Sequence, residues 1–339
     1  MKPGRRALFV LALFALLAVL PLVAAGFDEY FYVGQLRRIL IFAIAAISLD
    51  LILGYGGMVS LGHAAFLGIG AYVVGILNYH ADEGTALFGL IPGSRNILVT
   101  WPAAMLISAT VAAVVGLISL RTSGLYFIMI TLAFAQMIYF FFVSLEAYGG
   151  DDGFRFPGDI PAVEATAEAV ESLGLDDPVA SFELVFYYLV FAVLVAVYYC
   201  CSRLVNSRFG LVLQGCRENE RRMRAVGFAT FPYRLAAFTL AGGIAGLAGA
   251  LFAAHESFIS PSIMHWTRSG DLIVMVVLGG MGTLIGPVAG AGFFLLLEKF
   301  LPDYTEHWPI LFGPILILVV LFAKRGLYGI FVRADKDGI

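Results

Sequence analysis

Ser60 and His63 are the first residues of this sequence whose types and spacing suggest chemistry. A serine and a histidine three positions apart on a helix face the same side, and such a pair can act as nucleophile and general base. Acyl transfer also needs a third group that orients the histidine, and neither that group nor a Gly-x-Ser-x-Gly turn accompanies the pair. We therefore favour a hydrogen-bonding role for the imidazole in a polar turn over intramembrane hydrolysis, and we predict no catalytic residue.

The segment around this pair is rich in glycine and interrupts the apolar pattern. Gly54–Tyr72 follows the apolar run Ile39–Leu53 and leads into another, Ala64–Leu77. Glycine permits backbone bends and close helix approach. Irregular backbone at membrane depth is tolerated only where protein or a water-filled cavity satisfies it. A polar, glycine-broken segment between two hydrophobic runs therefore predicts part of a translocation pathway.

Polar residues also interrupt other apolar runs. An acidic residue at the centre of a spanning helix costs about 2.5–3.5 kcal/mol, so Asp50 should face the interior or water, whereas Asp271 could lie near the external interface at lower cost. For Thr131 and Gln136, lining a cavity and bonding a neighbouring helix are equally good interpretations. The predicted substrate pathway comprises Asp50, Gly57, Ser60, Gly62, His63, Thr131, Gln136 and Asp271.

A short internal echo links the two halves of the chain. Asp50-Leu-Ile-Leu precedes Gly56-Gly-Met, and Asp271-Leu-Ile-Val precedes Gly279-Gly-Met. The spacings differ by two residues, so the echo indicates either two similar broken elements, as transporters commonly have, or a coincidence.

The composition indicates a membrane protein. Hydrophobic residues make up 60% of the 339 residues and charged residues 13%, against roughly 25% charged in soluble domains. The net charge of −3 argues against nucleic acid as a partner. The three cysteines have no metal-binding spacing, and we expect free thiols and no metal site.

A spanning helix needs about 20 apolar residues, and nine runs approach or exceed that length. They are Ala7–Ala25, Arg38–Leu53, Gly62–Leu77, Ile97–Leu120, Leu125–Leu145, Leu184–Cys201, Leu235–Ala254, Leu284–Phe300 and Pro309–Ala323, and Asp271–Met281 is a shorter tenth. We predict an all-α polytopic membrane protein, with residues 1–339 as a single transmembrane domain of about ten crossings. The first run could alternatively be a signal peptide that is removed.

Charges in the loops predict the orientation. Loop 202–234 contains seven arginines and two acids, whereas loop 146–183 contains ten acids and one base. Positive charge favours the cytoplasmic side, so the first loop should be cytoplasmic and the second external. Basic residues near both termini place both ends in the cytoplasm, which requires an even number of crossings, and Arg37 and Arg38 at an external end are a mild violation.

Each of the two loops has a predicted role. The external loop should contain a short surface helix over Ala162–Leu173, and its acidic Gly149–Asp159 part should receive an external protein. The cytoplasmic loop should form a helix over Gly210–Arg224 with a charged face, which suits docking onto a soluble partner. The chain lacks a Gly-x-x-x-x-Gly-Lys-[Ser/Thr] loop, so an ATPase, if there is one, must be a separate subunit, and we expect no cofactor in this chain.

Several sequence blocks resemble the permease subunits of ABC importers for branched-chain amino acids, specifically the longer of the two permeases. The blocks are GYGGMVSLGHAAFLGIGAY from Gly54, GLYFIMITLAFAQ from Gly124, GGDDG from Gly149 and VVLGGMGTLIGPVAGA from Val276. The resemblance extends from about Ile39 to Leu297. Two departures are Asp50, where relatives more often have Asn, and Tyr148, where a Thr commonly precedes Gly-Gly.

The resemblance implies an assembly in a bacterial or archaeal plasma membrane. Its partners would be a paralogous permease, two cytoplasmic ATPases that bind ATP, and an external substrate-binding protein. The segment with Arg217, Glu218, Glu220 and Gly227 resembles the family's ATPase-coupling loop, and Asp151 and Asp152 fall in the expected binding-protein contact.

Other functions remain open at the level of sequence. The family also includes permeases for urea, short amides and other small acids. A channel, a membrane enzyme or an ion-coupled secondary transporter that works alone are alternatives of other classes, and the last would use Asp50 or Asp271 as its ion site.

Overall fold

We describe a computed structural model of the full chain. It describes residues 3–25, 30–87, 91–157, 163, 166, 178–304, 307–322 and 326–331. The predicted surface helix over Ala162–Leu173 falls almost wholly outside the described residues, and so do the basic residues of the C-terminal tail.

The described residues as far as Val143 form five long helices and two short strands. They are α1 (Pro3–Ala25), α2 (Tyr30–Asp50) with a π-helical turn at Leu51–Tyr55, α3 (His63–Asp82), β1 (Ala86–Leu87), β2 (Ile91–Pro92), α4 (Ile97–Ser119) and α5 (Leu125–Val143). Strands β1 and β2 pair antiparallel. The Asn96 side chain caps α4 by accepting a hydrogen bond of 3.0 Å from the Leu98 backbone N–H.

The chain after α5 is also mainly helical. Its elements are a 3₁₀ turn (Glu146–Tyr148), β3 (Phe154–Arg155), α7 (Pro178–Val205), α8 (Arg208–Ala225), α9 (Thr230–Glu256), β4 (Phe258–Ile259), a 3₁₀ turn (Pro261–Met264), α10 (Trp266–Gly279), α11 (Gly286–Tyr304), α12 (Trp308–Phe322) and α13 (Gly326–Phe331). Strands β3 and β4, about a hundred residues apart in the sequence, also pair antiparallel.

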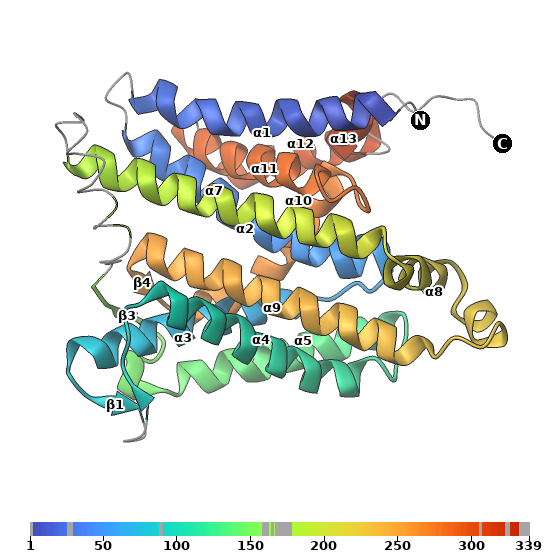
Figure 1. Cartoon of the computed structure of the whole chain (residues 1–339), viewed down its shortest axis with the longest axis horizontal. Coiled ribbons are helices and arrows are strands. Elements are labelled where there is room, and N and C mark those ends of the chain that lie inside the picture. Colours follow the sequence, from blue (N-terminus) through green and yellow to red (C-terminus); the bar gives the residue numbers. More distant parts are fainter. Residues whose placement is uncertain are drawn as a thin grey trace.

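The long helices lie side by side and run along the longest axis of the molecule (Figure 1). Helix α8, the start of α1 and α13 lie at one end, which we call the α8 end. Strands β1, β3 and β4 lie at the opposite end, the strand end. The arginine-rich loop and the described first part of the acidic loop, residues 146–157, therefore lie at opposite ends, as their charges predict.

Six helices of the described residues are long and apolar enough to cross a membrane, namely α1, α3, α4, α5, α7 and α9. Helices α2, α10, α11 and α12 are shorter or carry more charge, yet they pack in the same bundle through α2·α7, α2·α9, α10·α11 and α11·α12 contacts. These ten helices occupy the predicted crossings, so the all-α polytopic fold is confirmed. Helix α10, with 14 residues, is the short one.

Helix α2 forms the centre of the bundle. Every residue from Ile39 to Gly56 is buried, as expected for a helix that is apolar on all sides. At the strand end of α2, Arg37 is 4% exposed and forms a 2.9 Å ion pair with Glu183 of α7. This pairing offsets the positive charge that the orientation rule disfavours at that end.

Small residues allow the close contacts around α9. A β-carbon at Gly70 of α3 would collide with the Gly246 backbone, and one at Gly249 would collide with the Leu67 carbonyl. The Ser108 hydroxyl of α4 donates a 3.1 Å hydrogen bond to the Phe66 carbonyl. Close backbone approach through small residues is the usual means of helix association in membranes.

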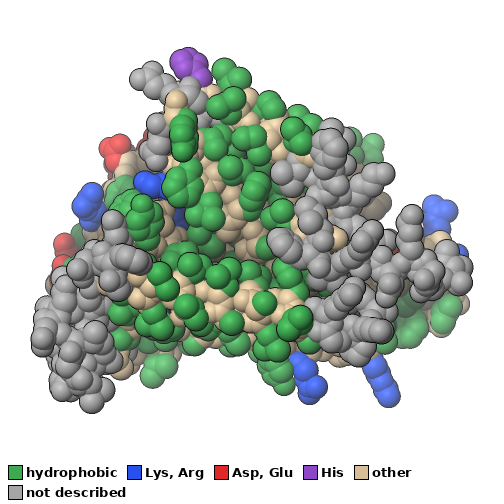
Figure 2. All heavy atoms as spheres, turned by 90° about the horizontal axis from the view of Figure 1, so that it is seen from above, with side chains coloured by type: hydrophobic (Ala, Val, Ile, Leu, Met, Phe, Trp, Pro, Cys, Tyr) green, Lys and Arg blue, Asp and Glu red, His purple; other side chains and the backbone are tan. Residues whose placement is uncertain are grey.

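Apolar side chains dominate the surface between the two ends. Figure 2 shows one such face, on which hydrophobic side chains prevail among the described atoms and Lys and Arg appear at the periphery. Helix α5 is among the most exposed, with Leu125 69%, Tyr126 74% and Phe140 61% accessible. Lipid or a partner chain must cover such a surface.

Candidate functional site

The glycine-broken segment after α2 reverses the chain inside the bundle. Leu51–Tyr55 forms a π-helical turn, and α3 begins at His63 after an irregular stretch. Gly57 has φ +65°, a conformation that glycine adopts without strain. The Met58 N–H donates to the Ile52 carbonyl at 2.8 Å, so part of the irregular backbone is satisfied locally.

Asp50 holds a second irregular segment, the loop between α10 and α11. Its carboxylate accepts hydrogen bonds from the Gly282 N–H at 2.7 Å and the Leu284 N–H at 3.0 Å. The side chain is fully buried, and two backbone donors compensate a carboxylate in such a place. The two elements that the sequence echo pairs are therefore in direct contact.

The two acids of the echo have different environments. Asp50 is inaccessible, whereas the Asp271 side chain is 33% exposed and interacts with Arg268 instead of a backbone loop. The echo thus marks two glycine-broken turns that contact each other. The two acids that precede these turns do not occupy equivalent positions in the structure.

Helix α8 reaches the same place through Arg217. The Arg217 guanidinium donates a hydrogen bond to the Gly54 carbonyl in the π-helical turn. Gly57 lies against the same side chain, because a β-carbon there would be 2.9 Å from Arg217 Cγ. Arg217, predicted to contact an ATPase, therefore binds the broken segment of its own chain.

His63 and Ser60 do not form a nucleophile–base pair. The His63 Nε2 atom lies 2.7 Å from the Ser48 hydroxyl of α2, and that hydroxyl donates to the Ala45 carbonyl at 2.7 Å. His63 Nε2 must then be the donor, and Nδ1 is buried without a hydrogen-bond partner among the described residues. The Ser60 hydroxyl accepts from the Gly62 N–H at 3.2 Å. The arrangement ties α2 to the start of α3.

Three predicted pathway residues do come together. Ser60, Gly62 and Thr131 line one narrow gap with aromatic and aliphatic side chains of α3, α4, α5 and α9, and the gap has no room for a water molecule. A β-carbon at Gly62 would be 2.6 Å from the Thr131 carbonyl. Gln136 lies on the same helix as Thr131, and its Nε2 is buried without a hydrogen-bond partner in the described part of the chain.

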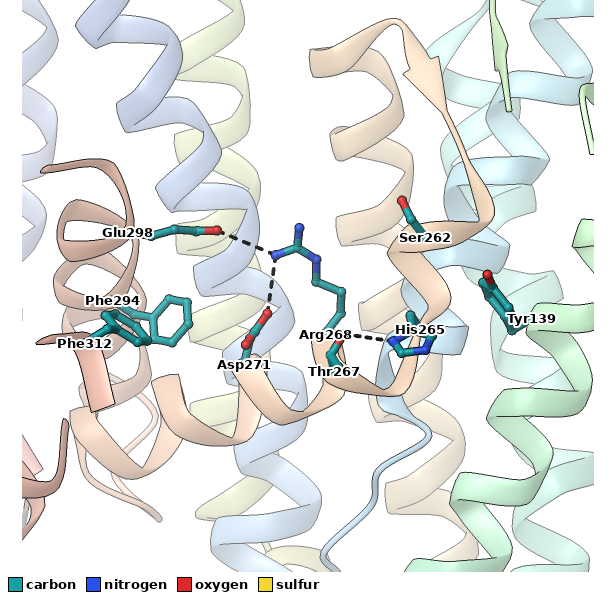
Figure 3. Close-up of a pocket in the computed structure, with 9 residues that line it drawn as sticks. All are labelled: Tyr139, Ser262, His265, Thr267, Arg268, Asp271, Phe294, Glu298 and Phe312. Atoms are coloured by element: carbon teal, nitrogen blue, oxygen red, sulfur yellow. Dashed lines mark hydrogen bonds and ion pairs between the residues drawn. The ribbon is translucent and has the colours of Figure 1, made fainter. Parts of the chain in front are cut away.

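Asp271 lines a larger pocket, of about 400 Å³, beside the first turns of α10 (Figure 3). The pocket is bounded by Tyr139, Ser262, His265, Thr267, Arg268, Asp271, Phe294, Glu298 and Phe312. Arg268 lies 3.3 Å from Asp271 and 3.8 Å from Glu298. The sequence placed only Asp271 here. The spacing of Arg268 and Asp271 on one helix could have indicated their pairing, but no local pattern indicates Glu298.

Helix α8 confirms the predicted amphipathic segment and extends it at both ends, over Arg208–Ala225. A break at Asn219, with φ −159° and ψ 95°, divides it just before Glu220. Glu218 is exposed. Gly227, with φ +98°, ends the segment in a conformation that favours glycine.

Glu220 anchors the second part of α8 to the start of α9. Its carboxylate binds Arg224 at 2.5 Å, Arg234 at 3.0 Å and the Thr230 hydroxyl at 3.0 Å. Burial raises the pKa of Glu220, but the charge of Arg234, the Thr230 hydroxyl and Arg224 outweigh it, so this pKa lies below its ordinary value.

Asp151 and Asp152 lie in an exposed turn directly before β3, which is at the strand end. Gly149, Gly150 and Gly153 in this turn all have positive φ. Pairing of β3 with β4 then joins the turn to the chain that leads into α10. Among the described residues no group of three or more His, Cys, Asp or Glu side chains could hold a metal ion.

Comparison with known proteins gives a consistent result. The profile of the family described as branched-chain amino acid transport system, permease component, matches residues 31–323. The high-affinity branched-chain amino acid transport system permease proteins LivM of Salmonella typhimurium (strain LT2) and Escherichia coli (strain K12) are each 28% identical to this chain, over 85% of it and 68% of their own lengths. The probable branched-chain amino acid transport permease protein LivM of Methanocaldococcus jannaschii is 23% identical, over 85% of this chain and 90% of its own. No solved structure has a significant match.

These relatives come from bacteria and an archaeon, and the apolar helices described above are of membrane-spanning length. The chain is thus a multi-pass protein of the plasma membrane. It belongs to the family of permease components of branched-chain amino acid transport systems.

Proposed function

We propose that this chain is one of two permease subunits of an ATP-driven importer that moves branched-chain amino acids into the cytoplasm. Family membership supports the permease role, and the names of the relatives support the substrate. The observation that carries the ATP-driven mode is the contact of α8 with the broken segment. A helix at one end of the bundle that binds an irregular turn inside it can receive motion from a cytoplasmic partner.

The assembly would contain four further proteins. A paralogous permease would cover the exposed apolar face of α5, and two ATPases, which bind the ATP, would dock on the α8 ends of the two permeases. An external binding protein would deliver the substrate at the strand end, where Asp151 and Asp152 are exposed. In this assembly residues 1–339 form one transmembrane domain, loop 146–183 lies outside and loop 202–234 couples to the ATPase. This chain contributes no catalytic residue.

An ion-coupled mode is less well supported by the contacts. The Gly282 and Leu284 N–H groups of the loop after α10 both donate hydrogen bonds to the Asp50 carboxylate, so a cation that binds Asp50 would have to displace them. The narrow gap at Ser60 and Thr131 fits a closed state of a pathway that opens only when the helices move.

Uptake into proteoliposomes tests the proposal. The complex of this chain with its paralogue, the ATPases and the binding protein should accumulate radiolabelled leucine only with ATP on the ATPase side. Excess valine or isoleucine should compete, and excess urea or acetamide should not. Accumulation by this chain alone under a proton or sodium gradient would contradict the proposal, and competition by urea alone would assign a different substrate.

A further inference from the structure

The pocket around Asp271 combines both signs of charge. Arg268 and Asp271 come from the first two turns of α10, and Glu298 comes from α11, across the pocket from them (Figure 3). The three side chains are 39%, 33% and 26% exposed, so each retains an accessible surface within the pocket.

These charges lie on helices of the bundle, and Glu298 lies back from the end of its helix. Glu298 precedes the end of α11 at Tyr304 by six residues, which corresponds to about 9 Å along the helix. Ionised side chains at such a depth do not face hydrocarbon and instead face protein or a water-filled space. The pocket must therefore be hydrated or covered by another chain.

An apolar surface adjoins the charges. Phe294 of α11 and Phe312 of α12 stack edge to face with ring centroids 5.0 Å apart on the Glu298 side of the pocket. Tyr139 of α5 and His265 form a second aromatic pair, 5.6 Å apart, on the opposite side. A cavity of about 400 Å³ whose walls combine aromatic rings with convergent charged and hydroxyl groups can hold a small molecule that has both apolar and charged parts.

We propose that this pocket binds a zwitterionic α-amino acid with an apolar side chain during transport. Arg268 would bind the carboxylate, Asp271 and Glu298 would bind the ammonium group, and Phe294 and Phe312 would contact the side chain. This inference rests on the proposed function and adds to it a binding site within the permease.

The existing ion pairs leave Arg268 able to exchange partners. Charge-assisted N–H···O bonds of optimal geometry measure about 2.7–2.9 Å, and both Arg268 pairs are longer. A guanidinium has five donors, so Arg268 can donate hydrogen bonds to a ligand carboxylate while Asp271 or Glu298 turns to the ligand ammonium group. Because the ligand replaces interactions that already exist, its binding should be weak, as a site on a transport route requires.

A cysteine at Thr267, an exposed residue of the pocket, can report on occupancy. The experiment uses the assembled complex in nanodiscs without the binding protein, in a background with the exposed Cys200 replaced by serine. A charged, membrane-impermeant methanethiosulfonate should react with Thr267→Cys, and L-leucine should slow the reaction. Isocaproate and isoamylamine, which each lack one of the two charges, should not protect at the same concentration.

Arg268→Gln should raise the half-protecting leucine concentration about tenfold or more, because one hydrogen bond to a charged group is lost. Arg121→Gln, which removes an exposed arginine outside this pocket, is the matched control and should leave protection unchanged. No reaction at Thr267→Cys, no protection by leucine, or equal protection in Arg268→Gln would overturn the site. If those results accompany normal leucine uptake, the site fails and the proposed function stands; absence of leucine uptake by the unmodified complex contradicts the function itself.

Discussion

The Arg217 guanidinium donates a hydrogen bond to the Gly54 carbonyl, and this contact joins α8 to the turn that ends α2. One turn before Gly54, Asp50 holds the backbone of Gly282 and Leu284. Helix α8, the glycine-broken segment after α2 and the loop between α10 and α11 are therefore connected by consecutive hydrogen bonds. A displacement of α8 must either move this turn or break the bond.

Valine at Gly57 or Gly62 should block transport while the complex still assembles. Gly57 has φ +65° and would push its side chain against Arg217, whereas a β-carbon at Gly62 would press on the Thr131 carbonyl. A β-branched residue at the positive φ of Gly57 costs about 1–2 kcal/mol, but the contacts, which both positions have, are what should displace Arg217 and α5. Leucine uptake per assembled complex should fall at least about tenfold in each variant because of this displacement, which corresponds to about 1.4 kcal/mol.

Gly84→Val is the matched control for strain. Gly84 has φ +63°, and a β-carbon at this position would have no atom within 4 Å, so valine there has the same backbone cost without the contacts. It should transport nearly normally. If Gly57→Val and Gly62→Val both matched this control, the broken segment would have no part in the pathway.

Replacement of His63 by alanine should reduce leucine uptake only partly. The change removes the 2.7 Å hydrogen bond to Ser48 and leaves a small cavity between α2 and α3. A net loss of about 1–3 kcal/mol in stability is expected, since a buried hydroxyl loses its donor. Unfolding of the purified complex and uptake should be measured together, and complete loss of uptake at normal assembly would show that the imidazole acts in the mechanism.

Much of this architecture could be predicted from the sequence, because apolar length and loop charge directly reflect the membrane. The order of helices, the opposite placement of the two loops and the helical segment around Arg217 are of this kind. Asp50 was recognisable as a costly buried acid. Its partners, Gly282 and Leu284, were not, because backbone donors have no sequence signature and lie more than 230 residues away.

The role of His63 shows a second limit. Its spacing from Ser60 suggested a pair on one helix face, but the chain is irregular there and α3 begins only at His63. The true partner, Ser48, belongs to the preceding helix. Spacing arguments hold within a regular element and fail across a break.

Replacement of Glu218 should affect ATPase binding, whereas replacement of Glu220 should affect the stability of the complex. Glu218→Lys changes an exposed charge and should weaken ATPase docking with little change in unfolding temperature. Glu220→Gln breaks the pairs with Arg224 and Arg234 and should destabilise the α8–α9 junction by about 1 kcal/mol. Thermal unfolding of the complex and binding of the isolated ATPase measure the two effects, and identical behaviour of both variants would contradict this division.

The contribution of Glu220 to the stability of the α8–α9 junction should depend on pH. Because its folded-state pKa lies below the ordinary 4.5, the stabilisation is fully present above that value and is lost as the pH falls through the lower folded-state pKa. The protection factors of residues 219–227, which compare the exchange rate with the intrinsic rate at the same pH, should therefore fall at acidic pH in the unmodified protein. In Glu220→Gln the protection of this segment should already be low at neutral pH, with a much weaker acid dependence.

Single cysteines should locate the two ends of the bundle on opposite sides of the membrane. Asp152→Cys at the strand end should react with an impermeant maleimide added outside intact cells, and Arg221→Cys on α8 should react only after permeabilisation. Cys200 is exposed and must first be replaced by serine. The reverse pattern would invert the orientation and place α8 away from any cytoplasmic ATPase.

The coupling ratio of Arg217→Ala is the most direct measurement of the central claim, that α8 acts on the transport route through Gly54. The number of ATP molecules hydrolysed per leucine imported should be compared in proteoliposomes for the unmodified complex, Arg217→Ala and the control Arg203→Ala, which removes another exposed arginine near this end. We expect Arg217→Ala to keep its ATPase activity while uptake falls, so the ratio rises several-fold, and Arg203→Ala to leave it unchanged. An unaltered ratio in Arg217→Ala, with normal assembly, would contradict the account.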